Sequence, residues 1–273
     1  MQANIESGVQ LLTRLSHRPD LLNLDEVVFP NSFNSKATLE IIGNVSSGKT
    51  LLLTQLLAKC ILPEWYKEIF IKGCNASAVL INTDHHFKVS KLAELMYFVI
   101  YNICKANNSG NIDNKTIKSI VHTSLENLII INCYESNQFS IALETLDNIF
   151  LSNDRIAMVA IDSISSYYWE DRKSGGAWSL NNYVKKLLEI IQNHTLQFNV
   201  ALIYTNAMTN NKEPITCASS PNLGKINYRV ELCKRESSLQ IPEFYSTISS
   251  FQFTKKLSYT IDTSGIQWAK ENA

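Results

Sequence analysis

The sequence lacks an excess of charge of either sign. Its 273 residues include 25 lysines and arginines against 25 aspartates and glutamates, so the formal net charge is zero. Domains that hold nucleic acid mainly by bulk electrostatics are usually basic, and this composition argues against that class of protein. Contact with DNA through a local basic cluster, or through a basic partner, stays open.

Paired cysteines and long apolar runs are also missing. The six cysteines are scattered and form no Cys-x-x-Cys pair, whereas disulfide scaffolds of this cysteine number are far shorter and zinc sites usually show paired spacing. The most apolar stretch, residues 95–104, has about half the length that a bilayer requires. The first residues resemble no secretory signal. We therefore expect reduced thiols in the cytosol or nucleus and no membrane span.

Apolar residues make up 45% of the chain, which is enough for a buried core. Short apolar segments alternate with helical ones, and this order predicts an α/β fold with a mostly parallel sheet covered by helices on both faces. The expected strands are 39–42, 78–82, 128–132, 156–161 and 200–204, and the expected helices are 50–60, 91–104, 139–151 and 180–194. Mixed strands at the C-terminal edge are expected at 228–233, 248–253 and 258–268, the last a hairpin that turns at 263–265.

Residues 1–36 are expected to form an N-terminal arm, and residues 37–273 a single core domain. Ile5, Val9, Leu12 and Leu15 share one stripe, which predicts a short amphipathic helix over 5–16. A loose segment is expected to follow it, up to about residue 36.

One segment matches the phosphate-loop pattern G-x-x-x-x-G-K-[ST] between a predicted strand and a predicted helix. Its residues are Gly43, Asn44, Val45, Ser46, Ser47, Gly48, Lys49 and Thr50. Glycines let consecutive main-chain N–H groups face phosphate oxygens, and the helix adds its positive end. Lys49 would reach the β and γ phosphates, and the Thr50 hydroxyl would ligate Mg²⁺. The pattern predicts binding of ATP with magnesium; a purely structural glycine turn is the alternative.

An acid stands at the end of the predicted strand 156–161. In a phosphate-loop fold, Asp162 would lie beside the nucleotide and hold the water shell of the magnesium ion. The alternative is that Asp162 caps the helix that follows.

A second acid, Asp84, follows the strand at 78–82. A carboxylate at the end of a strand beside the first strand could orient an attacking water, so Asp84 is a candidate catalytic base. His85 and His86 come next, but adjacent residues of an extended segment point in opposite directions. No third ligand is suitably spaced, so packing or hydrogen bonding is favoured over metal binding.

With these features in place, the chain resembles the ATPase core of the RecA-like recombinases. More specific segments resemble one branch, the non-filament-forming paralogues of the eukaryotic recombinase. These segments are 6–15, 60–63, Thr83-Asp84 with His86-Phe87, 162–169 with Asp171-Arg172 and Gly175-Gly176, and 228–234. The similarity covers nearly the whole chain; it is strongest over 39–206 and thin over 235–257.

The resemblance implies a RecA-type core without the separate N-terminal helical domain of the recombinase. It also implies a nuclear, ATP-binding accessory subunit in a complex of four recombinase paralogues, with the D-type paralogue as direct neighbour. That complex would serve homologous recombination at double-strand breaks, crosslinks and stalled forks, and DNA would be contacted mainly through the complex.

Two departures from the family pattern bear on hydrolysis. Recombinases have a glutamate where this chain has Asp84, and the missing methylene withdraws the carboxylate by about 1 Å from a water that a base must contact closely. The family's glutamine that senses the γ-phosphate would fall at Ala207, which cannot form that hydrogen bond. We therefore expect weak or absent ATP hydrolysis. The arm has no Phe-x-x-Ala motif, so filaments are not expected.

By family position, 172–178 would be a first DNA loop and about 208–224 a second. Arg172 and Lys173, with Trp169 and Trp178 nearby, could combine phosphate contact with base stacking. The second loop carries only Lys212 and Lys225 against Glu213, which is sparse charge for binding DNA.

Two other functions remain as alternatives. The first is a pure protein scaffold whose phosphate loop is a relict. The second is a free-standing phosphate-loop ATPase or kinase, which would need a competent base and an arginine-rich lid; neither is visible in the sequence.

Overall fold

The computed structural model describes residues 6–31, 33–106, 113–173, 175, 179–207, 217–236 and 242–269. Its strands are β1 (Thr38–Gly43), β2 (Trp65–Tyr66), β3 (Ile69–Phe70), β4 (Ser77–Asn82), β5 (Leu128–Asn132), β6 (Ile156–Asp162), β7 (Ala201–Ala207), β8 (Tyr228–Glu236), β9 (Pro242–Ser250), β10 (Thr254–Asp262) and β11 (Gly265–Trp268). Its helices are α1 (Gly8–Ser16), α2 (Lys49–Ile61), α3 (Val89–Ala106), α4 (Asn114–Leu125), α5 (Ser136–Ser152), α6 (Tyr168–Lys173) and α7 (Leu180–Gln197).

Across the described residues, one nine-stranded sheet runs in the order β11-β10-β9-β8-β1-β7-β6-β4-β5. The six strands from β8 to β5 are parallel, and the remaining pairs toward β11 are antiparallel. Strands β4 and β6 are buried along their whole length, because helices cover both faces of the sheet. The predicted α/β fold with mixed strands at the C-terminal edge is confirmed.

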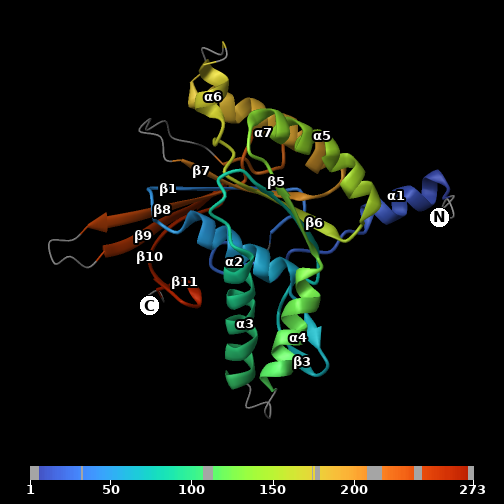
Figure 1. Ribbon diagram of the computed structural model, residues 1–273, viewed down its shortest axis with the longest axis vertical. Coiled ribbons are helices and arrows are strands. Elements are labelled where there is room, and N and C mark those ends of the chain that lie inside the picture. The colour runs from blue at the N-terminus through green and yellow to red at the C-terminus, as the bar shows by residue number, and fades with distance from the viewer. Residues whose placement is uncertain are drawn as a thin grey trace.

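Two apolar clusters fill the space between the sheet and its helices. Helices α2, α3 and α4 lie on one face, and α5 and α7 lie on the other (Figure 1). Leu52 and Leu56 of α2 pack in the first cluster with Leu95 of α3, whereas Leu146 of α5 and Ile191 of α7 pack in the second. The sheet is thus packed against helices on both faces. Because its central strands are parallel, their carboxyl ends lie together at one edge.

Most of the expected elements lie within three residues of their predicted ends. The strand expected at 248–253 has the wrong bounds: β9 covers its first three residues but ends at Ser250, where a turn leads into β10. The Ser250 hydroxyl accepts the N–H groups of Gln252 and Phe253, both at 3.2 Å, and this local bonding fixes the turn. The final hairpin turns between β10 and β11, where it was predicted.

The segment after α1 is not loose, contrary to expectation. Leu21, Leu24, Val28 and Phe29 are each at most 3% exposed and belong to the first apolar cluster. The Arg18 guanidinium donates to the carbonyl oxygens of Asn153, Ile156 and Phe150, at 3.2, 2.6 and 2.9 Å. The apolar residues of this segment follow neither the helix period nor the strand period, so the sequence pattern did not indicate that they are buried.

Helix α1 begins at Gly8, after a capping box formed by Ser7 and Gln10. Its apolar stripe faces mainly solvent: Val9 and Leu12 are 75% and 68% exposed, and only Leu15 packs against the core. Ile5 lies outside the described residues. All six cysteines are free, as expected, and none of the described helices is long and apolar enough to span a membrane.

Candidate functional site

The predicted phosphate loop connects β1 to α2 and requires glycine at two positions. A Cβ on Gly43 would come within 2.2 Å of the Leu232 carbonyl oxygen, because β8 runs directly beside it. Gly48 has φ +98°, a left-handed conformation that other residues rarely adopt, and it forms the N-cap of α2. These glycines produce a tight curl of main chain at the carboxyl end of β1.

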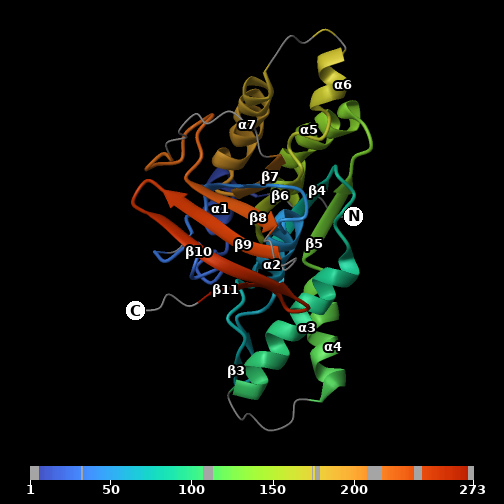
Figure 2. The ribbon, with the colours of Figure 1, turned by 90° about the vertical axis from the view of Figure 1, so that its left-hand side faces the viewer.

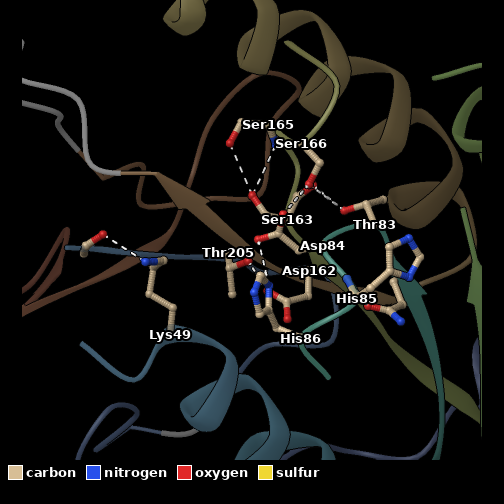
Figure 3. Close-up of polar contacts among 12 residues, drawn as sticks. Lys49, Thr83, Asp84, His85, His86, Asp162, Ser163, Ser165, Ser166 and Thr205 are labelled. Carbon is tan, nitrogen blue, oxygen red and sulfur yellow. Dashed lines mark hydrogen bonds and ion pairs between the residues drawn. The ribbon is translucent and has the colours of Figure 1, made fainter. Parts of the chain in front are cut away.

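The loop presents an exposed crest above a buried base. Asn44, Val45 and Ser46 are exposed, whereas Ser47 is fully buried. The Lys49 amine donates to the carbonyl oxygens of Gly43 and Asn44, both at 3.0 Å. Figure 3 shows this side chain reaching back across its own loop.

The pKa of Lys49 lies below its usual value because partial burial disfavours the ammonium form. The charges of Asp162 and Asp84 oppose this effect and favour the ammonium form. The lysine thus lies in the field of both predicted acids, which the fold brings to the same strand edge.

Asp162 ends β6 and is almost entirely buried, at 1% exposure. Its Oδ1 accepts a hydrogen bond of 2.5 Å from the Thr205 hydroxyl on β7, while Oδ2 has no hydrogen-bond partner among the residues that the structure describes. Burial raises the pKa of Asp162; the hydroxyls of Thr205 and Thr50 act to lower it, and the nearby charge of Asp84 acts to raise it. The alternative of a helix cap is not observed, because α6 begins only at Tyr168.

The residues of this edge fit a nucleotide bound with magnesium. Buried polar atoms normally have partners, yet within the described ranges Ser47 Oγ and Asp162 Oδ2 have none. Thr50 lies close enough to Asp162 to influence its pKa, so a hydroxyl and a carboxylate converge where Mg²⁺ would find the oxygen ligands it prefers. Lys49 and the curled main chain would then face the phosphates.

Asp84 lies close to Asp162, but its strand, β4, does not lie beside the first strand, contrary to the prediction from the sequence. In the sheet, β7 and β6 separate β4 from β1. The N–H groups of Thr83 and Asp84 donate to the Asp162 carbonyl at 2.8 and 2.9 Å, next to a cis peptide bond between Asp162 and Ser163. The Asp84 side chain is 45% exposed, and its Oδ1 accepts from the Ser166 hydroxyl at 3.2 Å (Figure 3).

The two histidines after Asp84 have different surroundings. The His85 ring stacks on Tyr134, with ring centres 4.4 Å apart and planes inclined by 11°. His86 Nδ1 lies 3.8 Å from Asp84 Oδ2. No group of three or more potential metal ligands occurs among the residues that the structure describes. For His85, the packing role favoured by the sequence is observed.

Two polar residues of the site were not identified from the sequence. Thr205 bonds to Asp162, and Ser166 bonds to both Asp84 and Thr83. Thr205 had a usable signal, because it is polar at the carboxyl end of an apolar strand that runs parallel to β6. Ser166 had none, since its position depends on the path of the loop after β6.

The structure places the candidate DNA residues on α6. Arg172 and Lys173 are both exposed, and the Arg172 guanidinium lies 5.4 Å from the centre of the Trp169 ring, which is itself 65% exposed. A cation and an aromatic face are therefore presented together. Trp178, Gly176 and the 208–216 part of the second loop, with Lys212 and Glu213, lie outside the described residues.

Comparison with known proteins identifies similar chains. The family profile described as Rad51 matches residues 20–226. The chain is 26% identical to the DNA repair protein XRCC2 of Mus musculus over 242 residues, which is 84% of this chain and 79% of the mouse protein. It is 22% identical to the DNA repair protein XRCC2 homolog of Arabidopsis thaliana over 61% of this chain and 53% of the plant protein.

Proposed function

Because the chain belongs to the Rad51 family, we propose that it is an accessory nucleotide-binding subunit of a recombinase-paralogue complex. The resemblance drawn from the residues is confirmed, both to RecA-like recombinases and to one particular paralogue, the second-group X-ray-repair cross-complementing protein. The similar proteins carry DNA repair in their names. This supports a nuclear role in homologous recombination at double-strand breaks, crosslinks and stalled forks.

One observation carries the nucleotide-binding part of the proposal. The phosphate loop, Thr50 and the buried Asp162 meet at the carboxyl ends of β1 and β6, and Asp162 retains an oxygen without a partner in the described structure. The ligands that fit are ATP and Mg²⁺. When bound, the ion would neutralise phosphate charge; Thr50 would hold it directly and Asp162 would hold its water shell.

The chain's own groups favour retention of the nucleotide over its turnover. Asp84 is shorter than glutamate, and its carboxylate already accepts a hydrogen bond from Ser166. Ala207, at the end of β7, has no side-chain amide that could donate a hydrogen bond to a γ-phosphate. A base must reach its water at about 2.6–3.2 Å, so we expect ATP hydrolysis by the isolated subunit to be weak or absent.

We further propose that the bound nucleotide helps to join this subunit to its neighbours. RecA-like cores typically hold nucleotide between two subunits. In this chain the crest of the phosphate loop and the Asp84 side chain are exposed, so the site is open on one side. The partners would be other recombinase paralogues, with the D-type paralogue as direct neighbour. DNA would be contacted mainly through the complex, with a contribution from Arg172 and Lys173.

One observation favours a second candidate, the scaffold with a relict phosphate loop. The Lys49 amine is already bonded to two carbonyl oxygens of its own loop, so the loop has internal partners for its lysine. No comparable observation favours the other alternative, a free-standing phosphate-loop ATPase or kinase.

Substitution of Lys49 by alanine separates the two candidates. The matched control is Lys118→Ala, which removes an exposed lysine from α4. We expect Lys49→Ala to abolish Mg-ATP binding and to weaken co-purification with the other paralogues, while the control behaves as wild type. If Lys49→Ala loses nucleotide binding but assembles and supports repair normally, the scaffold is correct and the accessory nucleotide-binding role is rejected.

A further inference from the structure

The C-terminal hairpin β10–β11 packs against the phosphate loop, although more than 200 residues separate them in the chain. The Tyr259 hydroxyl, on β10, donates a hydrogen bond of 2.7 Å to the Ser47 carbonyl, and Tyr259 itself is 2% exposed. A Cβ on Gly48 would meet the Ile261 and Ile266 side chains at 3.2 and 3.3 Å. The hairpin therefore supports the loop at Ser47 and Gly48.

The same hairpin is fastened to the helix that follows the loop. The Gln55 amide on α2 bonds twice to Ile266: its Oε1 accepts the Ile266 N–H at 2.9 Å, and its Nε2 donates to the Ile266 carbonyl at 3.3 Å. Lys91 on α3 donates to the Thr263 carbonyl at the tip, at 2.9 Å. Gly265 has φ +109°, and a Cβ there would lie 2.5 Å from Gln55 Oε1. Figure 2 shows the tip of the hairpin beside α2 and α3.

Strand pairing does not by itself explain this position. Strand β10 pairs with β9 only from Thr254 to Ser258, and from Tyr259 to Asp262 it pairs only with β11. The outer half of the hairpin thus leaves the main sheet. In the described structure it contacts the phosphate loop, α2 and α3. It also contacts Asp25, whose Oδ2 accepts from Trp268 Nε1 at 3.2 Å, and the Phe244 ring of β9, whose centre lies 5.3 Å from that of Tyr259. The position of the hairpin therefore depends in part on the shape of the loop.

Peptide geometry connects Tyr259 to the proposed phosphate site. In a trans peptide unit the C=O and N–H bonds point in opposite directions. Since the Ser47 carbonyl points at Tyr259, the N–H of Gly48 points away from the hairpin. Phosphate loops bind through such main-chain N–H groups, so the Tyr259 hydroxyl determines the direction of one of them.

We propose that β10–β11 is a clamp that holds the phosphate loop in its nucleotide-binding shape, with Tyr259 as a positioning residue. The inference rests on the proposed binding of nucleotide. The clamp couples nucleotide binding to the stability of the hairpin. A ligand that fixes the loop also stabilises the hairpin, and a change that loosens the hairpin lowers the affinity for the ligand by the same factor.

The test is Tyr259→Phe in the full chain, which keeps the ring and leaves the buried Ser47 carbonyl without its donor. We expect the Kd of Mg-ATP to rise about 5- to 20-fold, as befits the loss of a buried hydrogen bond. Gln55→Ala, a second variant, should shift Kd in the same direction. The control is Tyr167→Phe, which removes a similar bond from Tyr167 to the Cys133 carbonyl, at 2.5 Å, in the other apolar cluster; its Kd should stay within twofold of wild type.

Hydrogen exchange supplies the readout that a merely structural role would not move. In the wild type, Mg-ATP should slow amide exchange over 254–268, and this protection should shrink in Tyr259→Phe but not in Tyr167→Phe. In the ligand-free protein, exchange over 43–50 should rise in Tyr259→Phe but not in the control Tyr167→Phe. If the wild type binds no Mg-ATP, the proposed function fails and the clamp fails with it. If it binds while Tyr259→Phe keeps both affinity and exchange unchanged, the clamp alone is rejected.

Discussion

The Thr205 hydroxyl lies 2.5 Å from Oδ1 of Asp162 and donates to it. This bond joins the carboxyl ends of β7 and β6 and fixes the direction of a carboxylate that is 1% exposed. The other oxygen, Oδ2, is left without a partner among the described residues, and the Thr50 hydroxyl is close enough to the carboxyl group to lower its pKa. A buried acid kept in this arrangement is costly to the fold and useful to a cation.

Asp162→Asn should separate these two effects. The amide keeps an oxygen for Thr205 but carries no charge, so we expect the ligand-free variant to be at least as stable as wild type toward unfolding. Its affinity for Mg-ATP should fall about 10- to 100-fold, the range found when groups that orient a metal site are lost. Denaturant unfolding and calorimetric titration measure the two quantities. A variant that is less stable and binds as well as wild type would contradict the assignment.

The same pair of proteins has a predictable pH dependence. The pKa of Asp162 is raised above its ordinary 3.8 in the folded state, so the folded protein binds this proton more tightly than the unfolded chain. The free energy of unfolding of wild type, relative to Asp162→Asn, should therefore fall as pH rises from about 3.8 through the raised pKa, and then stay constant. A difference that grows in favour of wild type over this interval would exclude an uncompensated buried acid.

Hydrolysis should depend on Asp84 and Ala207 together. We expect wild type to release phosphate from Mg-ATP slowly, Asp84→Glu to be modestly faster, and Asp84→Glu with Ala207→Gln to be fastest, because a base and a γ-phosphate contact are both needed. Steady-state phosphate release by purified subunits gives the order, and Lys49→Ala supplies the background rate. A wild type as fast as the double variant would show that neither departure limits turnover.

Gly43→Ala should damage both fold and site, because the added Cβ would lie 2.2 Å from the Leu232 carbonyl oxygen. Relief requires β1 and β8 to move apart, and we expect a loss of about 2–4 kcal/mol in the free energy of unfolding. Gly8→Ala is the matched control, since a Cβ there meets nothing within 4 Å and alanine favours a helix. Equal stability of the two variants would contradict the close approach of β8.

Breaking the buried ion pair between Glu40 and Arg229 should destabilise the sheet beneath the loop. Glu40 on β1 is 4% exposed; its Oε2 accepts from Arg229 Nε at 2.8 Å, and its Oε1 accepts from Asn206. Arg229→Met leaves a buried carboxylate uncompensated, and we expect it to cost about 3–5 kcal/mol. Adding Glu40→Gln should recover most of this loss.

The control for that pair is Lys72→Met. It removes the partner of Glu26, whose side chain is 74% exposed, and should cost under about 1 kcal/mol. Thermal or denaturant unfolding measures all four proteins. A cost at Arg229 no larger than that at Lys72 would contradict the expectation that an unpaired Glu40 carboxylate destabilises the fold.

The sequence predicted those parts of the molecule that have a strong local signal. Buried strands such as β4 and β6 are continuous apolar runs, and the phosphate loop has a fixed spacing, so the sequence alone is enough to place both. The burial of Leu21 and Phe29 could not, because irregular apolar spacing has no period to detect. The sequence also could not predict which strands lie beside β4, because strand order depends on how the chain crosses from one strand to the next.

The contact between Tyr259 and Ser47 shows the same limit within the site. The hairpin turn was evident from Thr263, Ser264 and Gly265, but its docking on α2 is a long-range contact fixed by Gln55 and the shape of the core. A single sequence contains no pattern that pairs positions so far apart.

Calorimetric titration of the full chain with ATP, in the presence and absence of magnesium, tests nucleotide binding by the phosphate loop most directly. Lys49→Ala and Lys118→Ala are titrated in the same way. We expect saturable, magnesium-dependent binding at one site by wild type and Lys118→Ala, and an affinity at least tenfold lower for Lys49→Ala. Absence of binding by wild type, or equal binding by Lys49→Ala, would contradict the claim that this loop holds a nucleotide.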